Sequence, residues 1–170
     1  MAYSPKRRLT FIPINHYGGT FTETGQKDPP STRDVALWQG LAIDFTKQTG
    51  EDPSHSTSAL IAWDPVAERE VWRVRAPRMV SVAAMATGGD LVFQGSIDST
   101  FNAYAAGDGR KLWSYATNSP PVSPSISYSV DGKQYVTVIT GIGSQTTWGQ
   151  TMLRYKLDYR TMERRVLTFA

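Results

Sequence analysis

The sequence predicts an all-β fold, a partial β-propeller of about three four-stranded antiparallel blades with one long inserted loop. The main observation is an internal repeat, because residues 60–72 and 101–113 superimpose at a spacing of 41 residues. Each copy has the pattern of a strand, a tight turn and a second strand that ends on tryptophan, Trp72 or Trp113. A period of about 40 residues built from strand–turn–strand units is typical of propeller blades.

The 170 residues are expected to form a single propeller segment. We predict a blade over 1–76 with an insertion over 16–58, a complete blade over 77–118 and a terminal blade over 119–170. Closed propellers contain about four to eight blades. Three units therefore predict part of a ring rather than a whole one.

The individual strands are predicted from apolar or alternating runs that end at turn residues. They are expected at 1–3, 9–15, 59–63 and 70–75, then at 81–86, 91–95, 100–105 and 111–115, and finally at 122–130, 134–140 and 164–169. Gly88 and Gly89 are expected to supply the positive φ angles of a tight turn. Asp131-Gly132 between alternating strands is a strong hairpin signal.

The insertion over 16–58 has no strand periodicity and is too long for a hairpin loop. Within it, residues 34–45 are apolar enough to pack, as a short strand or a helical turn. Outside it, Trp72 and Trp113 are expected to be core residues that lie against the backbone of the neighbouring blade. Ala62 and Ala103 face them and leave room for the rings.

Composition excludes several classes of protein. The net charge of +3 is spread along the chain, which argues against a nucleic-acid surface. The absence of cysteine excludes disulfides and thiolate metal sites. No apolar run is long enough for a transmembrane helix, and the apolar stretch at 9–13 is too short for a signal peptide. The protein is therefore expected to be cytosolic, unless its true N-terminus lies upstream.

The repeated segments resemble a known motif. The pattern Ala-x-Asp-x-x-x-x-Arg-x-x-Trp over residues 62–72, and its relaxed copy over 103–113, resemble the tryptophan-docking motif of quinoprotein dehydrogenases. Residues 87–95 and 130–136 are also similar to that family. These enzymes are periplasmic eight-bladed propellers that use pyrroloquinoline quinone (PQQ), and the chain is similar to their C-terminal portion.

The resemblance implies oxidation of alcohols to aldehydes with PQQ, a calcium ion that polarises the quinone, and a cytochrome-type electron acceptor. In the family, the catalytic aspartate and the calcium ligands come from earlier blades. No catalytic or metal-binding residue can be located in this chain, so it is expected to be inactive as an isolated fragment. Its expected partners are the remaining blades or, failing these, further copies of itself. A full-length protein would be periplasmic.

The best candidates for cofactor contacts lie in the glycine-rich segment 141–149. Gly141, Ile142, Gly143 and Trp148 are the predicted cofactor-binding residues, because glycine lets the backbone approach a flat ligand that an indole could cover. A plain connection between strands at the propeller mouth would have the same composition, so both interpretations stay open.

A non-catalytic propeller scaffold that binds protein partners is the alternative function. The sequence lacks Gly-x-Ser-x-Gly and a helix-opening Gly-x-Gly-x-x-Gly. His16 and His55 do not have the spacing of a zinc motif. These absences leave the resemblance as the main guide to chemistry.

Overall fold

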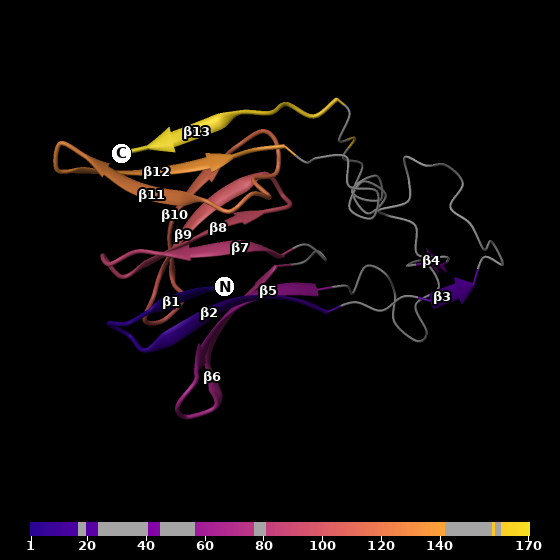
Figure 1. Cartoon of the computed structure of the whole chain (residues 1–170), viewed down its shortest axis with the longest axis horizontal. Coiled ribbons are helices and arrows are strands. Elements are labelled where there is room, and N and C mark those ends of the chain that lie inside the picture. Colours follow the sequence, from indigo (N-terminus) through magenta and orange to yellow (C-terminus); the bar gives the residue numbers. More distant parts are fainter. Residues whose placement is uncertain (17–19, 24–40, 45–56, 77–80, 142–157, 159–160) are drawn as a thin grey trace.

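The computed structural model describes residues 1–16, 20–23, 41–44, 57–76, 81–141, 158 and 161–170, and every structural statement below refers to these residues. Their regular structure consists of β-strands, which form three antiparallel sheets stacked on one another and a separate strand pair (Figure 1). The predicted fold class is therefore confirmed. The division of the chain into units stays a prediction.

The first sheet has the order β1-β2-β5-β6. Its strands are β1 (Ala2–Ser4), β2 (Leu9–His16), β5 (Thr57–Asp64) and β6 (Arg69–Ala76). Strands β2 and β5 pair although about 40 residues separate them in the chain, because the insertion leaves the sheet after β2 and returns at β5.

The second sheet has the order β10-β9-β8-β7, with β7 (Ser81–Ala86), β8 (Leu91–Ser96), β9 (Thr100–Ala105) and β10 (Lys111–Ala116). The β7–β8 turn differs from the prediction, because Asp90 rather than Gly88 or Gly89 has the positive φ, at 63°. Aspartate tolerates this conformation, and its carboxylate binds Lys6 at 2.6 Å and Arg7 at 3.0 Å on the first sheet.

The third sheet contains three strands among the described residues: β11 (Ile126–Val130), β12 (Lys133–Ile139) and β13 (Val166–Phe169). The hairpin prediction is confirmed, with φ angles of 50° at Asp131 and 78° at Gly132. Strand β11 begins later than predicted, at Ile126, because Pro124 cannot donate to a strand ladder.

Strands β3 (Thr20–Glu23) and β4 (Leu41–Asp44) pair only with each other. They lie apart from the three sheets, at the end where the insertion leaves β2 (Figure 1). For the segment 34–45 the structure thus shows a short strand over 41–44. The remainder of that segment lies outside the described residues.

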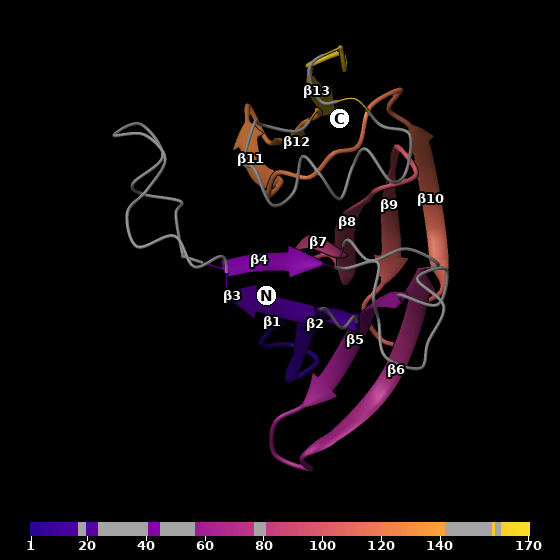
Figure 2. The same cartoon turned by 90° about the vertical axis from the view of Figure 1, so that its right-hand side faces the viewer.

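The main core lies between the first two sheets, which lie next to each other (Figure 2). The first sheet contributes Leu9, Phe11, Leu60, Ala62 and Trp72 to this core. The second sheet contributes Ala84, Val92 and Tyr104, and the β9–β10 turn contributes Ala106. A smaller core joins the second and third sheets through Phe101, Val136 and Val138. Successive sheets therefore pack face to face, as propeller blades do.

Trp72 joins the first two sheets as predicted. Its indole Nε1 donates a hydrogen bond of 3.0 Å to the carbonyl oxygen of Ala106. Its ring stacks on Phe11 at 5.7 Å between centroids and is 9% exposed. The six-membered part of the ring covers Gly109, where an added Cβ would lie 2.7 Å from Cε3. The indole thus contacts the backbone of the β9–β10 turn in the next sheet.

Trp113 differs from this arrangement, and the prediction that it is a core residue is wrong. Its side chain is 37% exposed. The ring makes edge contacts with Phe169 at 5.0 Å and Phe101 at 6.2 Å, and it stacks on Tyr115 at 6.1 Å. Among the described residues, the Trp113 ring thus contacts aromatic side chains, whereas Trp72 lies against the β9–β10 turn.

Candidate functional site

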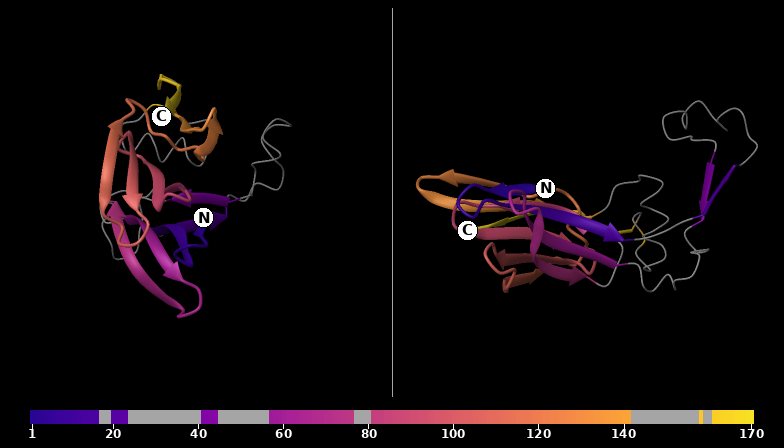
Figure 3. Two further views of the ribbon diagram at one scale, coloured as in Figure 1. Left: turned by 90° about the vertical axis from the view of Figure 1, so that its left-hand side faces the viewer. Right: turned by 90° about the horizontal axis from the view of Figure 1, so that it is seen from below.

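The two ends of the stacked sheets differ in their connections. Short turns close one end, over residues 5–8, 65–68, 87–90, 106–110 and 131–132. At the opposite end, which we call the loop end, β2 and β12 end and β5 and β13 begin (Figure 3). The short turn over residues 97–99 also lies there. The predicted cofactor segment begins at this loop end, immediately after β12. Binding residues are commonly carried by loops on a rigid scaffold of this kind.

Gly141 is the predicted cofactor residue that the structure describes. Its φ is 89°, a left-handed conformation that favours glycine. Its backbone N–H donates a hydrogen bond of 2.9 Å to the carbonyl oxygen of Pro120. An added Cβ would lie 2.7 Å from Cγ of Arg164 and 3.0 Å from the carbonyl oxygen of Glu163. The protein's own backbone packing therefore accounts for glycine here, and the side where a Cβ would project is filled.

A network of backbone and hydroxyl groups fixes the base of this segment. Thr140 is 1% exposed. Its backbone N–H donates to the Arg165 carbonyl at 2.8 Å, and its Oγ1 accepts from the Arg165 N–H at 3.1 Å. Ser123 Oγ donates to the Ile139 carbonyl at 2.8 Å and accepts from the Ile139 N–H at 3.1 Å. The segment that follows β12 thus starts from a rigid position.

The connection between β10 and β11 crosses the same end, and its residues Thr117, Ser119, Pro120 and Pro121 are buried. Thr117 Oγ1 donates to the Ser119 carbonyl at 2.7 Å. An added Cβ on Gly95 would lie 1.9 Å from the Pro121 carbonyl oxygen. Only glycine at the end of β8 permits so close a crossing. Sequence reasoning missed this contact, although the Pro120-Pro121 pair could have indicated a fixed crossover.

The other sequence-predicted site residues are not brought together by the described part of the chain. Ile142, Gly143 and Trp148 lie outside the described residues, as does His55. His16 is the last residue of β2, at the loop end. The assignment of these residues to a cofactor site therefore stays a prediction.

The pKa shifts of three titratable groups in the described ranges bear on acid–base chemistry. A carboxylate that acts as a general base near neutral pH has a raised pKa. Instead, hydrogen bonds from Arg7 and Lys6 lower the pKa of Asp90. Backbone N–H groups of the following turn lower the pKa of Asp64. Burial raises the pKa of Tyr104 to about 12. Each of these shifts moves away from neutrality.

Metal ligands are similarly dispersed. Within the part of the chain that the structure describes, no group of three or more histidine, aspartate or glutamate side chains could hold a metal ion. Calcium requires six to eight oxygen ligands. The described residues therefore do not fit a calcium site. The same described ranges contain no helix long and apolar enough to cross a membrane.

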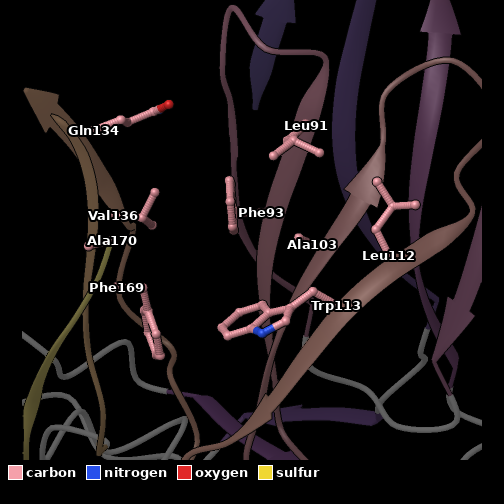
Figure 4. A pocket seen from close by; sticks show the side chains of 9 residues that line it. All are labelled: Leu91, Phe93, Ala103, Leu112, Trp113, Gln134, Val136, Phe169 and Ala170. Carbon is pink, nitrogen blue, oxygen red and sulfur yellow. The ribbon is translucent and has the colours of Figure 1, made fainter. Parts of the chain in front are cut away.

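One apolar cavity, of about 490 Å³, lies away from the Gly141 segment. It opens between the second and third sheets, beside Trp113, and extends to the ends of strands near the short turns (Figure 4). Its lining residues are Leu91, Phe93, Ala103, Leu112, Trp113, Gln134, Val136, Phe169 and Ala170. The cavity carries no ionisable side chain, so it offers apolar contact rather than acid–base chemistry.

Comparison with known proteins identifies the family. Residues 41–136 match the family model for the PQQ-type β-propeller domain of glucose, ethanol and alcohol dehydrogenases. The dehydrogenase subunit of the quinone alcohol dehydrogenase of Acetobacter aceti is 36% identical over 152 residues, which cover 84% of this chain and 20% of that protein. Lupanine 17-hydroxylase (cytochrome c) of a Pseudomonas species is 35% identical over 143 residues, covering 84% of this chain and 19% of that protein.

A solved structure shows the same relationship. The quinohemoprotein alcohol dehydrogenase ADHIIG from Pseudomonas putida HK5 superimposes with a TM-score of 0.78 and 31% identity, covering 98% of this chain and 25% of that one. This chain therefore spans about a fifth of the length of the curated relatives above. On this evidence the chain belongs to the PQQ β-propeller family of glucose, ethanol and alcohol dehydrogenases.

Proposed function

We propose that this chain supplies three consecutive blades to a PQQ-dependent dehydrogenase that oxidises alcohols to aldehydes, and that it has no activity alone. The observation that carries the proposal is the Trp72 contact. Trp72 and Ala106 lie within the family-matched residues 41–136, and their hydrogen bond of 3.0 Å joins two successive sheets in the manner of propeller blades. In this proposal other blades supply the base and the metal site; the described residues contain no group of three or more His, Asp or Glu that could hold a metal ion.

The contribution to the cofactor chamber would come from the loop end. PQQ is a flat, polyanionic quinone that would accept hydride from the alcohol when bound. The hydrogen bonds of Thr140 and Pro120 hold the backbone at Gly141 in one position. We propose that Ile142 and Gly143, which follow directly, and Trp148 further along the same segment form part of the wall around the quinone. Calcium, which the described residues do not fit, would be bound by other blades.

Complementation tests this proposal. The Acetobacter aceti dehydrogenase subunit, deleted for the segment that matches this chain, would be co-expressed with the 170-residue chain and supplied with PQQ and calcium. We expect dye-linked alcohol oxidation from the co-purified pair and from neither part alone. A matched control carries Val66→Ala, since Val66 is 81% exposed in a turn, and is expected to complement fully.

Two outcomes would contradict the proposal. Alcohol oxidation by the isolated chain with PQQ and calcium would show that it contains its own catalytic groups. A stable co-purified pair without PQQ-dependent oxidation would favour the alternative, a non-catalytic propeller scaffold. The electron acceptor would be tested with cytochrome c in place of the dye, because the lupanine hydroxylase relative is named for that acceptor. Cell fractionation of the full-length protein would test the proposed periplasmic location.

The partner proposal depends on the outward face of the third sheet. Five large apolar side chains on this sheet are more than 40% exposed: Ile126, Tyr128, Val130, Ile139 and Val166. Apolar surfaces of this kind are usually covered by a neighbour. We propose that the next blade covers this face in the complete protein and that the isolated chain self-associates. A monodisperse monomer by light scattering at micromolar concentration would contradict the second statement.

A further inference from the structure

The interface between the first two sheets changes from apolar to polar along its length. Near the short turns it contains the core around Trp72, Leu60 and Val92. Side chains two residues apart point to the same side of a strand. Toward the loop end, the core-facing sides of β5 and β8 therefore carry Ser58 and Gln94. Ser58 is 3% exposed and Gln94 is 8% exposed, and burial of such groups is destabilising unless they are hydrogen-bonded.

Ser58 carries a buried hydroxyl that the described residues do not satisfy. Its Oγ has no hydrogen-bond partner among them. Most buried polar side-chain atoms in proteins are paired, either with protein atoms or with ordered water. A buried hydroxyl that stays unpaired loses its hydration and gains nothing in return. The position of Ser58 in the sheet interface therefore points to a small bound group that completes its hydrogen bonding.

A narrow cavity of about 30 Å³ lies beside Ser58, between the first two sheets. Strands β5 and β6 line it on one side, and β8 and β9 line it on the other. Its polar lining residues are Ser58, Arg75, Gln94, Ser96 and Tyr104. A buried water molecule needs a volume of at least about 10–15 Å³ and two to four polar partners. The cavity provides both, and it is far smaller than a pocket for an organic ligand, which is about 300–1,000 Å³.

We propose that this cavity binds one ordered water molecule, which accepts a hydrogen bond from Ser58 Oγ and links it to the side-chain amide of Gln94. A primary amide has two donors and an oxygen with two lone pairs, so Gln94 can bind the water in addition to its other partners. The water joins the first sheet to the second on the loop-end side of the Trp72 core. This site depends only on the packing of the two sheets and not on the quinone chemistry.

Removal of the Ser58 hydroxyl has opposite effects with and without the water. With the water, Ser58→Ala removes a hydrogen bond, and the urea midpoint should fall by about 0.3–0.7 M at a fixed protein concentration. Without it, alanine removes an unpaired buried hydroxyl, and the midpoint should rise. An unchanged or raised midpoint would therefore overturn the inference. Ser125→Ala is the matched control, because Ser125 Oγ also has no partner among the described residues but Ser125 does not line the cavity. Equal falls at the two positions would also overturn it.

A double-mutant cycle shows whether a shared group connects Ser58 to Gln94. Ser58→Ala and Gln94→Met should each remove the bridge, so the double variant should lose clearly less than the sum of the single losses. Asn102 provides the control, because it pairs with Gln94 across β8 and β9 but bonds within its own sheet, to Thr100 Oγ1 at 3.0 Å and Ser114 Oγ at 2.7 Å. Losses from Ser58→Ala and Asn102→Leu should add. Additive losses from Ser58→Ala and Gln94→Met would contradict the bridge.

A high-resolution crystal structure of the unsubstituted chain tests the site without relying on the folding of any variant. We expect one density peak in the cavity at about 2.5–3.0 Å from Ser58 Oγ, the usual distance for a hydrogen bond between two oxygens. The same peak should lie within hydrogen-bond distance of the Gln94 amide. A cavity without a peak, a Ser58 hydroxyl bonded to a protein atom, or a peak with the scattering of an ion would each overturn the inference.

Discussion

The contact between Trp72 and Gly109 gives a prediction in which one glycine can be compared with another. Gly109 has a φ of 72°, and Gly132 in the β11–β12 hairpin has a φ of 78°. A Cβ on Gly109 would lie 2.7, 2.9 and 3.2 Å from three atoms of the Trp72 ring, whereas a Cβ on Gly132 would meet nothing within 4 Å. Alanine at the two positions therefore has the same backbone strain but different packing.

The magnitudes follow from these two terms. A left-handed backbone destabilises an alanine by about 1–2 kcal/mol relative to glycine. Alanine also reduces the conformational entropy of the unfolded chain, which stabilises the folded state by about 0.4–1 kcal/mol. Gly132→Ala should therefore destabilise by about 1 kcal/mol. Gly109→Ala adds an overpacking cost of about 1–3 kcal/mol, because the indole is held between Phe11 and the turn and has little room to move. We expect a total of about 2–4 kcal/mol.

Equilibrium unfolding in urea measures the difference. With an m-value of about 1–3 kcal/mol per molar, Gly109→Ala should lower the midpoint by roughly 1 M more than Gly132→Ala. In a Trp72→Ala background the additional cost of Gly109→Ala should largely disappear, because the clashing ring is absent. Equal midpoint losses for the two glycines, or an undiminished cost in that background, would refute the packing argument.

Three further predictions concern single contacts. Trp72→Phe should destabilise by about 1–3 kcal/mol, because it leaves the buried carbonyl of Ala106 without its donor; urea unfolding measures this, and a neutral result would contradict the hydrogen bond. Gly141→Ala should lower the urea midpoint, because an added Cβ would meet Arg164 in a left-handed backbone, and an unchanged midpoint would contradict that packing. Arg7 and Lys6 lower the pKa of Asp90 in the folded protein. Their ion pairs with Asp90 therefore stabilise the folded state above the unfolded-state pKa of about 3.9, and this stabilisation is lost as the pH falls through the lower folded-state pKa. Asp90→Asn should flatten the acid limb of a stability–pH curve, and an unaltered curve would show that the pair has no effect on folding.

The fold could be predicted from the sequence because its signals are local and repeated. The spacing between Trp72 and Trp113 marks two equivalent strand pairs, and the Asp131-Gly132 turn adopts the φ angles that its residue types favour. Such features depend on a few neighbouring residues, so they can be identified before any tertiary contact is known.

What could not be predicted depends on contacts between distant segments. Asp90 adopts the positive φ of its turn while bound to Lys6 and Arg7, which lie 83 or more residues away. The exposure of Trp113 depends on what packs against its ring, which its own sequence cannot show. At the candidate site, the need for glycine at position 141 arises from Arg164, a residue that no local pattern connects to it.

The two ends of this molecule can change independently. The indole contact of Trp72 and the ion pairs of Asp90 lie among the short turns, whereas the connections that vary most in length join strands at the loop end. Insertions or replacements at the loop end would therefore leave the contacts between sheets intact. For protein engineering, this separation means that the connections at the loop end can be exchanged without redesigning the contacts that join the sheets.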